Sequence, residues 1–184
     1  RLIDRAAALI PVERRCVAMV VRTSDAELHG LFLGDSEDAW AAAAALSAAV
    51  HITTVADSYD TVVSVVAPMY DDLWTAGKGV YKLKPIVRDG GELILFAPHV
   101  HSFSETHGKA IARAGYHCRD YFLAHSADLA DIPLGVLAHG AHVRGRGTYD
   151  VENGTETCRI TVTLATGIPR EECERVGLAW RDHR

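Results

Sequence analysis

Histidines are concentrated in two short segments of the chain. His99, His101 and His107 fall within APHVHSFSETH, and His139 and His142 fall within HGAH. Imidazole nitrogens bind zinc and exchange protons near neutral pH, so each segment can contribute to a metal site or to acid–base chemistry. Histidines of polar loops also bond simply to backbone or water, and the spacing alone leaves both interpretations open.

Basic residues beside glycines are a second candidate. Lys78 stands between two glycines in TAGKG, and Arg144 and Arg146 flank a glycine in HVRGRG. Most lysines are solvated surface cations, but glycine weakens a helix and indicates a close approach beside it. The pattern G-x-x-x-x-G-K-[ST] of a phosphate loop is absent. The two arginines suit a carboxylate or a phosphate, or they belong to a flexible basic loop.

The remaining composition argues against several classes of protein. No G-x-S-x-G nucleophile motif occurs, and Cys118 lies in an amphipathic pattern typical of a buried thiol. The four cysteines form no C-x-x-C pair, which favours reduced thiols and a cytoplasmic protein. A formal net charge of −5 without a basic stripe argues against nucleic acid, and no apolar run reaches membrane-spanning length.

These candidate residues must be positioned by alternating strands and helices. Short β-branched or apolar runs predict strands, of which the first two form a hairpin; they cover 16–22, 28–34, 61–67, 92–97, 134–138 and 158–165. Longer tracts predict helices at 35–50 with Asp35 as N-cap, at 70–84, at 108–128 and from Pro169. Such alternation predicts an α/β fold of three layers, with a largely parallel mixed sheet and helices on both faces. With 184 residues, the chain is expected to form a single domain, residues 1–184.

Each predicted buried strand is followed by a polar segment that contains glycine or proline. Ligands of open α/β sheets bind outside the carboxyl ends of the strands. The runs 61–67, 92–97, 134–138 and 158–165 are interpreted as strands of this kind, the first of them buried on both faces. If these strands are parallel, the segments after them line one crevice, which gathers Trp74, Lys78, His99, His101, His139, His142, Arg144 and Thr166.

The longest of these segments carries a family resemblance. SVVAPMYDDLWTAGKGVYKLKPIVRDGGELILFAPHV resembles the C-terminal domain of the nickel-dependent lactate racemase family. Upstream AMVVRTSDAELHGLFLGDSEDAW, and downstream GVLAHGAHVRGRGTY and VTLATGIPREEC, are similar to the same domain in the same order, so the resemblance covers nearly the whole chain. It implies an isomerase, a racemase or epimerase that interconverts stereoisomers of a 2-hydroxy acid by transient hydride transfer to a nickel-pincer nucleotide.

The resemblance also implies roles for particular residues. The family's domain carries a lysine on the helix after the central strand, which assigns the catalytic and substrate-binding role to Lys78, with Trp74 and Thr75 at the preceding cleft-facing positions. Lactate racemases tend to have Tyr-Gln at those two positions, so the departure points to a 2-hydroxy acid other than lactate. Three histidines complete the predicted substrate site: His99, His139 and His142.

One part of the family's pattern is missing from the sequence. No segment resembles the N-terminal domain, which tethers the cofactor and supplies the acid and base histidines. We therefore expect the chain to be a fragment of a longer polypeptide, to close the cleft of its own N-terminal domain, to supply no metal ligand and to be inactive alone. Two other interpretations stay open: a stand-alone ligand- or metal-binding module that uses the strand-end histidines, and a structural domain without chemistry.

Overall fold

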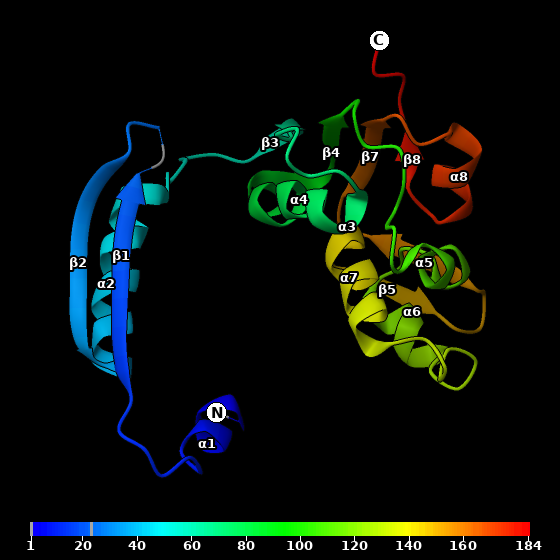
Figure 1. The fold of residues 1–184 in the computed structure, drawn as a ribbon. Helices are drawn as coiled ribbons and strands as arrows, with labels where there is room; N and C mark the ends of the chain where they lie inside the picture. The colour runs from blue at the N-terminus through cyan, green and yellow to red at the C-terminus, as the bar shows by residue number, and fades with distance from the viewer. Residues whose placement is uncertain (1, 23) are drawn as a thin grey trace. The chain divides into compact units, whose positions relative to one another are not determined.

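The structure, a computed structural model, describes residues 2–22 and 24–184. Its internal contacts divide the chain into two compact units, Arg1–Thr54 and Val55–Arg184 (Figure 1). The interpretation of residues 1–184 as a single domain stays a prediction. No helix of the described ranges is long and apolar enough to span a bilayer.

The first unit is a β-hairpin with a helix packed against it. The antiparallel pairing of the hairpin runs from Arg15 opposite Asp35 to Arg22 opposite Glu27, with a bulge after Val20. The Asp35 carboxylate accepts a hydrogen bond from the backbone N–H of Glu37 at 2.9 Å and so caps the following helix, which confirms the predicted N-cap. The elements are α1 (Leu2–Ala7), β1 (Arg15–Arg22), β2 (Glu27–Asp35) and α2 (Ser36–His51).

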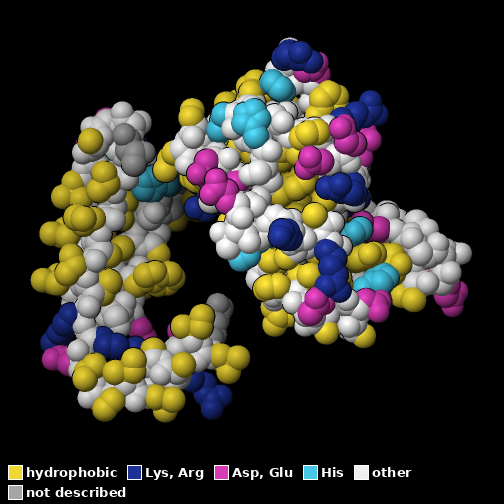
Figure 2. All heavy atoms as spheres, turned by 45° about the vertical axis from the view of Figure 1, so that its right-hand side comes forward, with side chains coloured by type: hydrophobic (Ala, Val, Ile, Leu, Met, Phe, Trp, Pro, Cys, Tyr) yellow, Lys and Arg dark blue, Asp and Glu magenta, His cyan; other side chains and the backbone are white. Residues whose placement is uncertain are grey.

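The hairpin differs from the prediction in one respect, because it forms a two-stranded sheet of its own and does not join the parallel sheet. Its inner face packs on α2, where Val20, Ala39 and Ala43 are buried. The outer face is also apolar, so hydrophobic side chains stand at the surface of this unit (Figure 2), among them Val17, Met19, Leu28, Leu31 and Leu33.

The second unit is built on a four-stranded parallel sheet in the order β3-β4-β7-β8, which confirms the predicted α/β fold class. Strand β7 is buried on both faces along most of its length, as is typical of an inner strand of a parallel sheet. At the edge, β3 buries Val62 and Ser64, whereas Val63 and Val65 are 54% and 76% exposed. The prediction that this strand is buried on both faces is therefore wrong for its outer face. The strands are β3 (Tyr59–Val65), β4 (Val87–Ala97), β7 (Thr161–Thr166) and β8 (Ala179–Trp180).

Short helices connect and cover these strands. The predicted helix 70–84 is interrupted at Gly77, which ends α3 and begins α4. A Cβ at Gly77 would lie 3.1 Å from both His139 and the Tyr81 hydroxyl, so close packing explains the glycine. The predicted break near Gly115 is present, with φ at +71°. The elements are α3 (Leu73–Ala76), α4 (Lys78–Leu83), η1 (Lys84–Ile86), α5 (Gly108–Ala114), α6 (Arg119–Ala124), α7 (Leu134–Arg144), β5 (Gly147–Asp150), β6 (Thr155–Cys158) and α8 (Arg170–Arg175).

The predicted strand 134–138 is wrong, because these residues begin helix α7. Val136, His139, Gly140 and Val143 are its buried residues, and their spacing of three, four and seven positions defines one helical face. An apolar run of five residues has no periodicity that separates a strand from a buried helix, and the strand was predicted for that reason. The HGAH segment therefore lies within a helix and not at a strand end.

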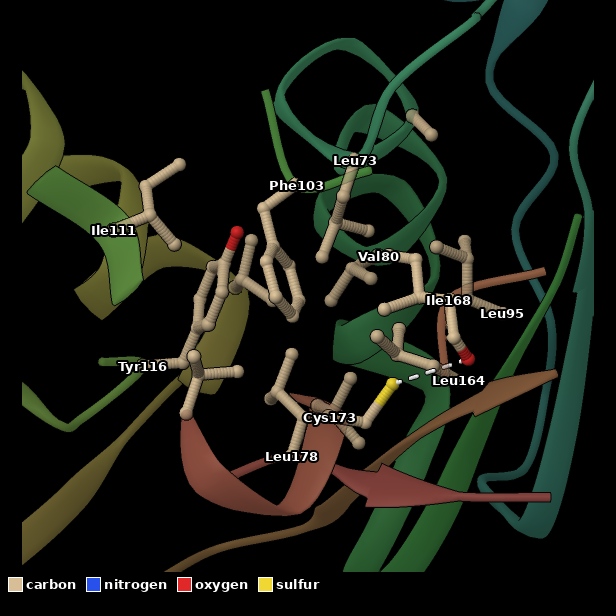
Figure 3. Close-up of a cluster of buried hydrophobic side chains, with 14 of the residues drawn as sticks. Leu73, Val80, Leu95, Phe103, Ile111, Tyr116, Leu164, Ile168, Cys173 and Leu178 are labelled. Carbon is tan, nitrogen blue, oxygen red and sulfur yellow. Dashed lines mark hydrogen bonds between the residues drawn. The ribbon is translucent and has the colours of Figure 1, made fainter. Parts of the chain in front are cut away.

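The core of this unit lies between the sheet and the helices. Figure 3 shows side chains from α3, α4, β4, α5, β7 and α8 converging on it. Burial raises the pKa of the Cys173 thiol to about 12, and the thiol donates to the Ile168 carbonyl at 3.8 Å, so it is a packing residue. Each fully buried leucine contributes about 2 kcal/mol of apolar burial; the side chains labelled in the figure are Leu73, Val80, Leu95, Phe103, Ile111, Tyr116, Leu164, Ile168, Cys173 and Leu178.

Candidate functional site

The candidate site lies where β3 and β4 end. The chain after β3 forms α3 and the start of α4, and the loop after β4 docks against it. The backbone N–H of Leu73 donates to Ser102 at 3.0 Å, and that of Trp74 donates to Phe103 at 2.9 Å. These two bonds tie both strand-end segments together, so Trp74 in α3 and His99 in the loop belong to one region, whereas the crevice itself stays a prediction.

Lys78 is the exposed first residue of α4. Its ammonium lies 5.3 Å from the centre of the Tyr70 ring, a cation–π distance. Across 2–22 and 24–184, no carboxylate forms an ion pair with it. The Lys78 charge is therefore available to an anion.

His99 is turned toward the chain that leads into α3. Its Nε2 lies 3.1 Å from the Tyr70 carbonyl oxygen. A carbonyl only accepts, so Nε2 carries the proton in this arrangement and holds Tyr70 in place. The ring is half-buried, and its bond to the Tyr70 carbonyl holds the residue whose aromatic ring lies beside Lys78.

Thr75 is held by a buried carboxylate. Asp72, 8% exposed, caps α3 by accepting from the Thr75 backbone N–H at 2.9 Å and from the Thr75 hydroxyl at 2.8 Å. Because the hydroxyl proton is committed to Asp72, the Thr75 oxygen can only accept a hydrogen bond from a ligand.

His139 is at the centre of an aromatic cluster. The side chain is 7% exposed. The Tyr81 hydroxyl lies 2.7 Å from Nδ1 and the Tyr116 hydroxyl 3.4 Å from Nε2. The imidazole also packs on Trp74 with 4.4 Å between ring centroids.

The environment of His139 fixes its protonation state. Burial lowers the pKa of His139 to about 4, against the opposing influence of Asp72. At neutral pH the ring is uncharged, so one nitrogen donates to a tyrosine and the other accepts from a tyrosine. Both nitrogens are thus occupied within the protein, and the ring packs against Trp74 instead of presenting a nitrogen to a ligand.

The other histidines are dispersed. The His107 ring packs on Trp74 with 4.5 Å between centroids, and His101 lies against Gly167. His142 is exposed, contacts Tyr81 at 5.1 Å and lines a separate hollow with Lys84. Among the residues that the structure describes, no group of three His, Cys, Asp or Glu side chains is placed to hold a metal ion. In the described ranges, His99, His101, His139 and His142 therefore form no such group.

Several residues of this region were missed by sequence reasoning. The capping role of Asp72 could have been predicted, since an aspartate just before an apolar helical segment is a typical N-cap. Tyr70 stands beside it in the same segment, without a pattern that marks it. Tyr81 and Tyr116 had none, because they meet His139 across separations of 58 and 23 positions.

The similarities of this chain to known proteins are similarities to solved structures. No family model matches the chain, and no curated protein matches it. A Thermotoga maritima protein of known crystal structure is 34% identical with a TM-score of 0.88, over 99% of this chain and 46% of that protein. The lactate racemase apoprotein from Thermoanaerobacterium thermosaccharolyticum is 16% identical with a TM-score of 0.61, over 91% of this chain and 38% of that protein. The chain therefore spans less than half the length of either protein, and it shares its fold with a part of lactate racemase.

Proposed function

We propose that this chain is the cleft-closing part of a racemase or epimerase that acts on a 2-hydroxy acid. The observation that carries the proposal is the Lys78 ammonium, which has no ion-pair partner in the described ranges and lies over the Tyr70 ring at the start of α4, just after the helix α3 that carries Trp74 and Thr75. The fold shared with lactate racemase supports it, as does the resemblance of the segment around Lys78 to that family's substrate-contacting helix.

The three side chains match the groups of a 2-hydroxy acid. Lys78 pairs with the carboxylate, because an ammonium and a carboxylate form a charge-assisted hydrogen bond. The Thr75 oxygen accepts from the substrate hydroxyl, since its own proton is held by Asp72. The Trp74 ring, supported by two imidazoles, forms a flat apolar wall that excludes water from the reacting carbon.

The family's nickel-pincer nucleotide supplies the hydride acceptor when it is bound. The described part of this chain has no cluster of metal-ligating side chains, so the proposal assigns the tethering lysine and the nickel ligands to an N-terminal domain of the same polypeptide. What this chain offers to an anionic cofactor is the Lys78 ammonium, which fits a phosphate as well as a carboxylate.

The test is Lys78→Ala in the natural polypeptide that carries residues 1–184, loaded with the cofactor. Chiral chromatography of a series of 2-hydroxy acids measures racemisation. We expect kcat/KM to fall about 10- to 100-fold, the worth of a hydrogen bond to a charged group. Lys82→Ala is the matched control, since Lys82 is an exposed lysine of the same helix.

Two outcomes would contradict the proposal. An equal, small effect of both substitutions would remove Lys78 from the reaction. Turnover by the 184-residue chain alone would show that no other domain is needed.

A further inference from the structure

Basic side chains surround two adjoining hollows at the end of the parallel sheet where β4 and β7 begin. The hollows measure about 760 and 470 Å³ and share Lys84, Gly145 and Arg146 in their walls. Arg119 lines the first hollow and Arg159 the second. We call this surface the basic groove. It is distinct from the candidate site of Trp74, Thr75, Lys78 and His99, which follows the carboxyl ends of β3 and β4 and which we call the Trp74 region.

Positive charge is in excess in the basic groove. Its two carboxylates are each paired with an arginine: Asp89 with Arg159 at 2.9 Å, and Asp120 with Arg119 at 3.4 Å. Lys84 and Arg146 have no carboxylate partner within the described ranges. The excess is local, because the whole chain carries a formal charge of −5.

The backbone holds these cations close together. Lys84 donates to the carbonyl of His142, and Arg159 donates to the carbonyls of Val87 at 2.7 Å and Lys84 at 2.6 Å. Carbonyl acceptors fix the positions of the side chains without cancelling their charge. Burial, together with the neighbouring Arg159 and Arg146, lowers the pKa of Lys84. An anion between these cations would relieve that repulsion.

The groove also has room for an organic group beside the cations. Small residues line the first hollow, namely Ala138, Ala141, Gly145 and Gly147. Gly145 ends α7 with φ at +92°, a conformation that favours glycine. A Cβ at Gly147 would lie 2.7 Å from the Thr157 carbonyl, so this wall cannot carry a larger side chain.

We propose that the basic groove binds the phosphate group of a small phosphorylated molecule, with the phosphate between Lys84 and Arg146 and the organic part over the small residues of the first hollow. Arg146 presents a guanidinium, whose fork matches two phosphate oxygens, and Lys84 adds a point charge. The site does not depend on the proposed racemase function, because it uses no residue of the Trp74 region.

The experiment is calorimetric titration of the 184-residue chain with inorganic phosphate and with phenyl phosphate, at constant ionic strength because surface electrostatics depend on salt. We expect saturable binding of both, tighter for phenyl phosphate. Arg146→Gln should weaken binding by about tenfold or more. Arg175→Gln removes the same charge from an exposed position on α8 and should leave binding unchanged.

A second measurement locates the ligand. In amide NMR spectra, phosphate should shift Gly145 and Gly147 while leaving Lys78 and Trp74 unmoved. Absence of saturable binding, equal weakening by both arginine substitutions, or shifts confined to the Trp74 region would each overturn the proposal. Circular dichroism of each variant establishes that it is folded before the titration is interpreted.

Discussion

The cluster around Trp74 and the basic groove lie on two sides of helix α7, and each contains one histidine of that helix in a different environment. His139 faces the cluster, where it is uncharged and bonded to two tyrosines. His142, one turn along, is exposed and lines the groove. Burial with hydrogen-bond partners makes His139 a packing residue, whereas exposure leaves the ring nitrogens of His142 open to solvent. The difference shows that the position of a residue on a helix, more than its type, decides its role.

The largest effect that we expect is on the free energy of unfolding, when a histidine is replaced on the cluster side or on the groove side of α7. His139→Ala leaves the hydroxyls of Tyr81 and Tyr116 without their partner and opens a cavity beneath Trp74. We expect the free energy of unfolding to fall by about 3 kcal/mol. His142→Ala, on the exposed side, should cost about 0.5 kcal/mol or less. Urea unfolding of both variants measures the contrast, and similar losses would break the comparison.

The second effect is a dependence of stability on pH. The folded pKa of His139 is about 4, below the ordinary histidine value of 6.5. The unfolded chain therefore binds a proton between these pH values that the folded chain does not, so the free energy of unfolding falls as pH drops through this window. The loss approaches about 3 kcal/mol near pH 4.

His139→Phe is the variant that isolates this effect. It removes the titrating group, so its stability should change less between pH 7 and pH 4.5 than that of the unaltered chain. Urea unfolding at both pH values gives the change in the free energy of unfolding for the variant and for the unaltered chain. Identical changes would mean that His139 is not held neutral by burial.

The smallest effect concerns two glycines. Gly77→Ala would push a methyl group to 3.1 Å from His139 and Tyr81, and we expect a loss of about 1–2 kcal/mol. Gly135 lies in α7 with nothing within 4 Å of an added Cβ, so Gly135→Ala should stabilise the chain by up to about 1 kcal/mol. Thermal unfolding measures both, and a gain at both positions would show that the cluster tolerates expansion.

The parts of the fold that the sequence predicted are those with local causes. The cap at Asp35, the hairpin and the break at Gly115 follow from residues within a few positions of each other. The helical conformation of α7 could not be predicted from local residues, because a short apolar run fits a strand and a helix equally well. The exposure of Val63 and Val65 follows from the edge position of β3, which depends on strand order and not on local pattern.

The candidate site also has features that could be predicted from the sequence and features that could not. The grouping of Trp74, Thr75, Lys78 and His99 could be expected, because segments after neighbouring parallel strands meet at one edge of a sheet. The roles of the histidines could not. His139 is defined by tyrosines distant in sequence, and His142 lies on the groove side because α7 is a helix.

The packing of the Trp74 indole against the rings of His107 and His139 has a consequence for observation in solution. An excited indole loses its emission to a protonated imidazole more readily than to a neutral one. Of the three tryptophans, Trp40 is 67% exposed and lies in the hairpin unit, and Trp180 belongs to β8. Trp74 is thus a built-in optical reporter, whose brightness responds to the charge of the buried His139 ring packed against it.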